Sequence, residues 1–466
     1  MLQPLAVRAI WFAMAGFALA SPARGDHSSI HATATGDVAT TDNVLSAPSG
    51  GREGDVYVQI RPGVLFAYDT PRLIQDLAAE LEVLEYAEHS HTPSLTARAG
   101  WRAVFTSGPR SELTMVANAS SGRLNAITAR TSPDQTSVGA VPAGEIKARQ
   151  ADASAQLGWQ ATHELRLAER GLVRWAATTD GLDMPTTTDS IELGAAITME
   201  RAFRHDTLGL DLGTGYVDLE RIAPPTPISG SSLVRAVEPQ ALALWRHDFD
   251  AAWSLAAEAG ALLIAPIGTD PYAPALPHPS GWYPVAGALV AYSQPWGHAS
   301  LAVRHAVAAN LLLAQNTVGD SATAQVAIPL PWLDDNPHAH APKLVALGSL
   351  GVERSAFVDP RTAMTLASFE LLRVDLGVGW TPKPGQTYGV RYELAVQHGN
   401  AAAAATIAPS FYRNTVFFTF ALRIPDRLTT DVPIHGASVR ADRGDVAPAP
   451  ADAEPVVPAA PAPADD

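Results

Sequence analysis

The sequence of 466 residues contains no cysteine and only three lysines, Lys147, Lys343 and Lys383. Without cysteine, the chain cannot form a disulfide, a thiolate metal site, a cysteine nucleophile or an acylated N-terminal cysteine anchor. The 47 acidic residues outnumber the 32 basic ones, so a formal net charge of −15 leaves no basic stripe for a phosphate backbone. We therefore expect no nucleic acid partner. Charged residues make up only 17% of the chain against 47% hydrophobic residues, which excludes a disordered chain.

Long hydrophobic runs are also lacking. The apolar run 9–19 follows Arg8 and ends at Ala20, and it is shorter than the roughly 18 residues that a membrane-spanning helix needs. It predicts a signal peptide over residues 1–20, cleaved near Ala20, with a single membrane anchor as the alternative. No later segment approaches twenty uninterrupted apolar residues, so any membrane residence of the exported chain must be as a β-barrel.

What the sequence does contain is an alternation with a period of two residues. Between 366 and 381, for example, Leu372, Val374 and Leu376 share one face of a strand, and Arg373 and Asp375 share the other. Eighteen segments alternate in this way: 28–44, 55–69, 72–88, 94–106, 111–124, 152–166, 171–179, 188–203, 206–220, 233–247, 251–265, 282–294, 298–313, 319–330, 343–357, 366–381, 386–398 and 412–424.

The length of these segments predicts an all-β fold, a transmembrane antiparallel up-and-down β-barrel over residues 21–430. A tilted membrane strand needs roughly nine to eleven residues, and most of the eighteen segments supply more. Short and long connections also alternate along the chain, as in outer-membrane barrels, with one exception. The exception is 332–342, where Pro329 and Pro331 interrupt the pattern. We expect eighteen strands, with sixteen as the alternative if the two segments around this connection are removed.

One segment fits two structures. Leu73, Leu77, Leu81 and Leu84 also form a helical stripe that runs through 76–88. We interpret the segment as a strand because a lone helix would break the alternation of connections on either side.

No catalytic motif is present, and charged residues on the polar faces are expected to line an aqueous lumen instead. We expect no enzyme, no cofactor and no metal, since His338 and His340 alone make an incomplete metal site. Because the lining residues carry both signs of charge, strong ion selectivity is not indicated. The expected lumen-lining residues are Arg98, Arg102, Arg174, Glu192, Glu258, Arg304, Arg373, Asp375, Arg391 and Glu393.

Aromatic residues on the apolar faces are expected to anchor the barrel in the headgroups of outer-membrane lipid. This predicted girdle comprises Trp101, Trp159, Trp175, Trp245, Trp253, Trp380, Tyr216, Tyr292 and Tyr388. After the last strand, residues 431–466 become acidic and rich in alanine and proline, which predicts a disordered tail in the periplasm.

The opening strands resemble those of outer-membrane β-barrels associated with bacterial exopolysaccharide export loci. The residues that carry the resemblance are Thr41-Asp42-Asn43-Val44, Asp55-Val56-Tyr57, Ile60-Arg61-Pro62-Gly63-Val64, Tyr68, Thr70-Pro71-Arg72 and Tyr86. The resemblance implies a conduit for a polysaccharide that works with a periplasmic polysaccharide-export protein. A general diffusion porin for small polar solutes, a hydrolase on a barrel scaffold and a surface barrel with a plugged lumen are the alternatives.

Overall fold

The protein forms eighteen β-strands in the computed structural model. The structure describes residues 27–44, 46, 51–88, 94–124, 146–179, 187–222, 231–272, 280–294, 296–312, 314–330, 344–358, 365–383, 385–400 and 410–424. The strands are β1 (His27–Thr41), β2 (Asp55–Asp69), β3 (Leu73–Tyr86), β4 (Ser94–Gly108), β5 (Ser111–Leu124), β6 (Ile146–Gln160), β7 (Leu165–Thr179), β8 (Thr187–Ala202), β9 (Asp206–Ile222), β10 (Ser232–Asp248), β11 (Trp253–Pro266), β12 (Gly281–Gln294), β13 (Gly297–Asn310), β14 (Gln315–Pro329), β15 (Leu344–Val358), β16 (Thr365–Lys383), β17 (Gln386–Gly399) and β18 (Phe411–Ile424). Within these described ranges, no helix is long and apolar enough to cross a membrane.

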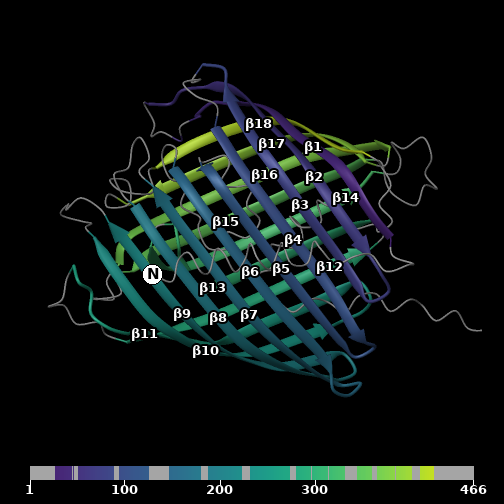
Figure 1. The fold of residues 1–466 in the computed structure, drawn as a ribbon, viewed down its shortest axis with the longest axis vertical. Helices are drawn as coiled ribbons and strands as arrows, with labels where there is room; N and C mark the ends of the chain where they lie inside the picture. The colour runs from purple at the N-terminus through teal and green to yellow at the C-terminus, as the bar shows by residue number, and fades with distance from the viewer. Residues whose placement is uncertain are drawn as a thin grey trace, which may run out of the picture.

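The strands form one closed antiparallel barrel. Each strand pairs with its neighbours in the sequence, and β1 pairs with β18 from Ala32 opposite Ile424 to Thr41 opposite Thr415. In Figure 1 the strands of the first half of the chain cross those of the second half, as the front and rear walls of a tilted-strand barrel do. Closure leaves no sheet edge, so every strand has a hydrogen-bonding partner on both sides.

The outer face of the barrel carries an apolar band with polar limits, interrupted on β7 by Glu169, which lies opposite Ile197. On β8, the outward residues from Ile191 to Met199 are all apolar, and they are bounded by Asp189 and Arg201. At about 3.3 Å per residue these limits lie about 40 Å apart along the strand, or about 30 Å across a membrane at a typical tilt of about 40°. This height matches the hydrocarbon core of a bilayer.

The same upper limit is visible on four strands further around the barrel. On their outer face, His305 lies 2.7 Å from Asp320, and Arg354 lies 3.9 Å from Glu370. Asp320 and Arg354 are opposite each other in the register, so the four residues form a row across β13 to β16. Below this row the outward side chains of β14 to β16 are uncharged down to the short turns.

The structure confirms eighteen strands and excludes the alternative of sixteen. The helix–strand ambiguity is resolved in favour of a strand, because β3 pairs with both β2 and β4. The connection of exceptional length, 330–343, lies at the end of the barrel that otherwise carries short turns. Conversely, 311–314 is short at the end that otherwise carries longer loops. The predicted signal peptide, the histidines at 338 and 340, and the tail lie outside the described residues.

The nine predicted girdle residues all lie on the outer face, but they do not all lie at a rim. Trp253 and Tyr292 pack together near the short-turn end with ring centroids 4.6 Å apart, and Trp380 and Tyr388 do so at 5.8 Å. Trp101, by contrast, lies in the middle of β4. It is therefore a residue of the apolar band, because the periodicity predicts the face of a strand but not the height along it.

A charge placed on the outer face is expected to destabilise the barrel. Leu376 is 55% exposed in the middle of β16, and Leu376→Arg should cost about 2 to 4 kcal/mol if the band lies in lipid. Gly351→Arg is the matched control, because Gly351 lies opposite Arg373 on the inner face and a Cβ there meets nothing within 4 Å. Gly377 is a poorer control, since its Cβ would lie 3.0 Å from the Val390 carbonyl oxygen. Denaturation in lipid vesicles measures both variants, and equal losses would contradict the assignment of faces.

Candidate functional site: the inner face of the barrel

The inner face is identified by side chains that meet across an intervening strand. Arg170 on β7 pairs with Asp211 on β9, and Glu258 on β11 lies 3.6 Å from Arg304 on β13. Such contacts are possible only on the concave side of the barrel wall. The register then assigns every other residue, because directly opposite residues of an antiparallel pair share a face.

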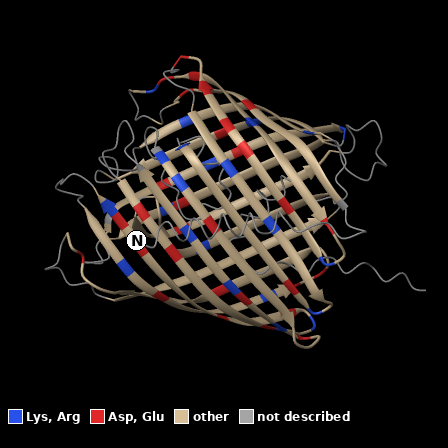
Figure 2. Ribbon diagram, viewed as in Figure 1, with Lys and Arg blue, Asp and Glu red and all other residues tan. Residues whose placement is uncertain are grey.

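Pairs of opposite charge occur around much of the inner wall. The pairs Asp37–Arg61, Glu82–Arg98, Arg174–Glu192 and Glu393–Arg413 have distances of 3.1, 2.9, 2.6 and 3.4 Å. In Figure 2 basic and acidic positions accordingly lie near one another on the ribbon instead of segregating into regions of one sign. Pairing lowers the free-energy cost of placing charged groups against the wall, where they are partly removed from water.

The structure places all ten predicted lining residues on the inner face. Six of them, Arg98, Arg174, Glu192, Glu258, Arg304 and Glu393, belong to the pairs just described. Arg102 lies opposite Asp76 and is exposed to the lumen. Asp375 accepts a hydrogen bond from the Ser349 hydroxyl at 3.5 Å, and Arg373 lies opposite Gly351.

The last two residues of the set differ from the sequence prediction. Arg391 and Glu393 are two residues apart on one face of β17, but Glu393 pairs with Arg413 and is only 1% exposed. The Arg391 guanidinium instead lies over the Phe417 ring, 4.3 Å from its centroid, and remains exposed. Glu393 therefore faces inward but is covered, which the alternation of polar and apolar residues cannot indicate.

The sequence prediction also missed several charged residues of the inner wall. Asp37, Arg61, Glu82, Arg170, Asp211 and Arg413 lie there as partners of the pairs described above. All except Arg170 lie in the polar phase of one of the eighteen predicted segments, so a search for charged residues in that phase would have found them. Arg170 lies between the predicted segments 152–166 and 171–179 and belongs to β7 in the structure. Their pairing could not be found in this way, because it depends on the register between strands.

The hairpin of β13 and β14 departs from the barrel wall at the loop end. Pairing of β12 with β13 ends at Ala286 opposite His305, whereas β13 continues beside β14 to Asn310 opposite Gln315. The described residues 306–312 and 314–319 beyond this point, which we name the β13–β14 tip, lie above the polar limit of the outer band. The tip is thus free of the wall on its β12 side.

The tip lies inside the barrel. Leu311 and Ala314, together with Val307 and Ala309, pack on an apolar cluster that includes Val217 of β9. The Thr188 hydroxyl of β8, five strands away from β13, donates a hydrogen bond to the Leu312 carbonyl oxygen at 3.1 Å. The other wall residues of the cluster are Leu219, Val234, Ala236, Leu242, Leu262, Ile264 and Val285. The tip therefore narrows the lumen from the β8 to β12 side.

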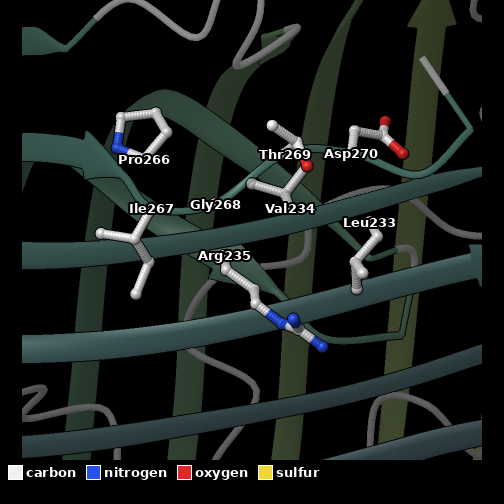
Figure 3. Close-up of a pocket in the computed structure, with 8 residues that line it drawn as sticks. All are labelled: Leu233, Val234, Arg235, Pro266, Ile267, Gly268, Thr269 and Asp270. Carbon is white, nitrogen blue, oxygen red and sulfur yellow. The ribbon is translucent and has the colours of Figure 1, made fainter. Parts of the chain in front are cut away.

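Two other features of the described residues offer no binding site of their own. Figure 3 shows a shallow hollow at the loop ends of β10 and β11, lined by Leu233, Val234, Arg235, Pro266, Ile267, Gly268, Thr269 and Asp270. Polar groups of its lining already bond to nearby residues of the chain. Ile267 N–H donates a hydrogen bond to the Arg235 carbonyl oxygen, and the Asp270 carboxylate accepts one from Tyr272 N–H. No group of three or more histidine and acidic residues in the described part of the chain could hold a metal ion.

No protein-family model and no curated protein matches the sequence. Among solved structures, the chain is similar to OccK2 (OpdF) of Pseudomonas aeruginosa, with 12% identity and a TM-score of 0.43 over 85% of this chain and 98% of that one. OpdK of Pseudomonas aeruginosa, solved with vanillate, gives 12% identity and a TM-score of 0.43 over 85% and 99% of the two chains. The FrpB iron transporter of Neisseria meningitidis gives 9% and 0.43 over 79% and 63%.

Labelling of single cysteines is expected to distinguish exposed from covered inner residues. A water-soluble maleimide should label Arg391→Cys and should spare Glu393→Cys, although both side chains face inward, because only the first is exposed. Val390→Cys, on the outer face, should be spared in lipid. The chain has no native cysteine, so the readout is unambiguous. Equal labelling at 391 and 393 would contradict the covered position of Glu393.

Release of the β13–β14 tip is expected to widen the lumen. Leu311→Asp places a charge in the apolar cluster, which should detach the tip and raise single-channel conductance about twofold. Leu347→Asp is the matched control, because Leu347 faces inward opposite Gly377, is 51% exposed and adds the same charge away from the tip. A folded Leu311→Asp variant whose conductance equals that of the control would show that the tip does not narrow the lumen.

Proposed function

We propose that the protein is an outer-membrane pore through which small polar solutes cross by diffusion, and that the predicted residues other than the covered Glu393 line its lumen. The observation that supports this proposal is that the two faces of the closed barrel wall differ in polarity. The outer face carries an apolar band of bilayer height, and the inner face carries charged pairs. Barrels of sixteen to eighteen strands leave room for an aqueous channel.

The inner wall supports weak rather than strong selectivity for ions. Most of the lining charges have a partner of opposite sign, so the wall presents no long surface of a single sign. Selection in such a channel depends on diameter and on the few exposed charges, such as Arg102 and Arg391. Both ions and uncharged polar solutes should therefore pass through the channel.

The inward position of the β13–β14 tip favours small solutes over a polymer. A polysaccharide must pass the mouth as an extended chain, whereas the tip occupies part of that mouth on the β8 to β12 side. Export of an exopolysaccharide with a periplasmic partner therefore gives way to its alternative, diffusion of small solutes.

The proposed function predicts both a location and a conductance. The protein should be recovered in the outer-membrane fraction with its N-terminus near Ser21, and it should resist unfolding by SDS until heated. In planar bilayers it should form stable conductance steps, and Asp375→Asn should shift the preference for cations modestly without loss of assembly. Recovery as a soluble periplasmic protein would contradict the barrel in the membrane. A barrel that does not conduct but has hydrolytic activity would favour the alternative of a hydrolase on a barrel scaffold.

A further inference from the structure

The connection between β1 and β2 carries a set of contacts that a simple loop does not need. Its described residues nearest to β1 are 42–44 and 46, and Asn43, Val44 and Ser46 are at most 4% exposed. These residues lie beside the seam where β1 meets β18, and Figure 1 shows β1, β2, β17 and β18 side by side. We name the described residues 42–44 and 46 the seam segment.

The seam segment is fastened to β18 by side chains and main chain. The Asp42 carboxylate accepts hydrogen bonds from the Asn414 main-chain N–H and side-chain amide, both at 2.7 Å. The Asn43 amide donates to the Tyr412 carbonyl oxygen at 3.0 Å, and Val44 N–H donates to the Glu53 carbonyl oxygen at 2.9 Å. Contacts of this density fix the course of the segment.

Arg413 is the inward-facing side chain of β18 that contacts the seam segment. Its guanidinium donates to the Ser46 hydroxyl at 3.0 Å and pairs with Glu393 at 3.4 Å. Arg413 and Glu393 are each only 1% exposed, whereas the arginine of every other inner-wall pair described above is 18 to 37% exposed. An ion pair on this wall can be so completely covered only if another part of the chain lies over it.

The backbone at Ser46 supports the same conclusion. Ser46 has a φ of 52°, in the left-handed region that residues other than glycine seldom adopt. Such a conformation persists where surrounding contacts hold it, and the bond from Arg413 to the Ser46 hydroxyl is such a contact.

The seam segment and the β13–β14 tip lie on opposite walls. In the ring of eighteen strands, β1 is nine strands from β10 in either direction, and β10 is the centre of the wall that the tip covers. Ser46 and the tip therefore contact inner-wall residues on opposite sides of the barrel.

We propose that Arg413 is a specificity-determining positioning residue, which locks the seam segment against the inner wall and thereby sets one side of the pore's size limit. The proposal rests on the proposed function, since a size limit has meaning only for a pore. Arg413 acts through the segment and does not itself contact the solute. Its loss should free the segment, uncover the inner wall and change the width of the mouth.

The experiment combines a chemical and an electrical readout. Val44→Cys reports the segment, because Val44 is 4% exposed and should not react with a water-soluble maleimide. Adding Arg413→Met should make the cysteine reactive, and it should change single-channel conductance by about 1.5-fold relative to the control. Arg391→Met is that control, because it removes the same charge from the inner face of the neighbouring strand but leaves the Ser46 contact intact.

A second variant separates loss of the lock from loss of the fold. Arg413→Met leaves Glu393 without this partner and can prevent assembly. Ser46→Ala removes only the bond from Arg413 to the segment, and it should increase labelling of Val44→Cys in a barrel that still resists SDS. Arg413→Lys, which keeps the charge, should restore part of the protection.

The outcomes separate this proposal from the proposed function. Persistent protection of Val44→Cys in folded Arg413→Met and Ser46→Ala would overturn the lock, whether or not the protein conducts. Labelling without a change of conductance beyond Arg391→Met would overturn the size limit. If the native protein does not conduct but Arg413→Met does, the lock is supported and the open pore is contradicted. If neither the native protein nor any variant conducts, the proposed function and the size limit are overturned, and the labelling of Val44→Cys alone decides the lock.

Discussion

Closure of the sheet is the constraint on which the rest of the structure depends. A strand within a membrane has no water to satisfy its peptide groups, so each must find a partner strand on both sides. Here the pairing of β1 with β18 supplies the last partner. Once the ring is closed, the two-residue period of a strand gives every second side chain to an enclosed face and the others to the exterior. The apolar band and the charged inner wall are two consequences of the same geometry.

The inner wall is organised by pairs of charges rather than by a surface of one sign. Arg174 with Glu192 and Glu82 with Arg98 show the common arrangement, in which a guanidinium meets a carboxylate on the neighbouring strand. Pairing offsets the cost of partial desolvation and reduces the field that an ion would meet. Glu393 with Arg413 uses the same chemistry differently, since that pair is covered and fixes a connection instead of facing solute. Ion pairs on this wall thus occur both along the open inner face and beneath the seam segment.

Alternation predicts the number of strands and their faces because it is a local property, but the connection expected between segments 152–166 and 171–179 lies at 161–164 in the structure. Leu376 and Asp375 were assigned to opposite faces from their phase alone, and the register agrees. The β13–β14 tip could not be predicted, because its inward course depends on where the pairing of β12 with His305 stops. The covering of Glu393 was missed for a related reason, as it requires Ser46, which is distant in sequence. Trp101 was placed at a rim although it lies in mid-strand, because periodicity carries no information on height.

The central claim is that one closed wall separates lipid from an aqueous lumen whose mouth is narrowed from two sides. Swelling of liposomes that contain the purified protein tests it most directly, with uncharged sugars of increasing size as the solutes. A wide lumen with a narrowed mouth predicts rapid entry of the smallest sugars and a steep fall in rate as size increases. Impermeability to every sugar, or equal rates across the whole series, would contradict it.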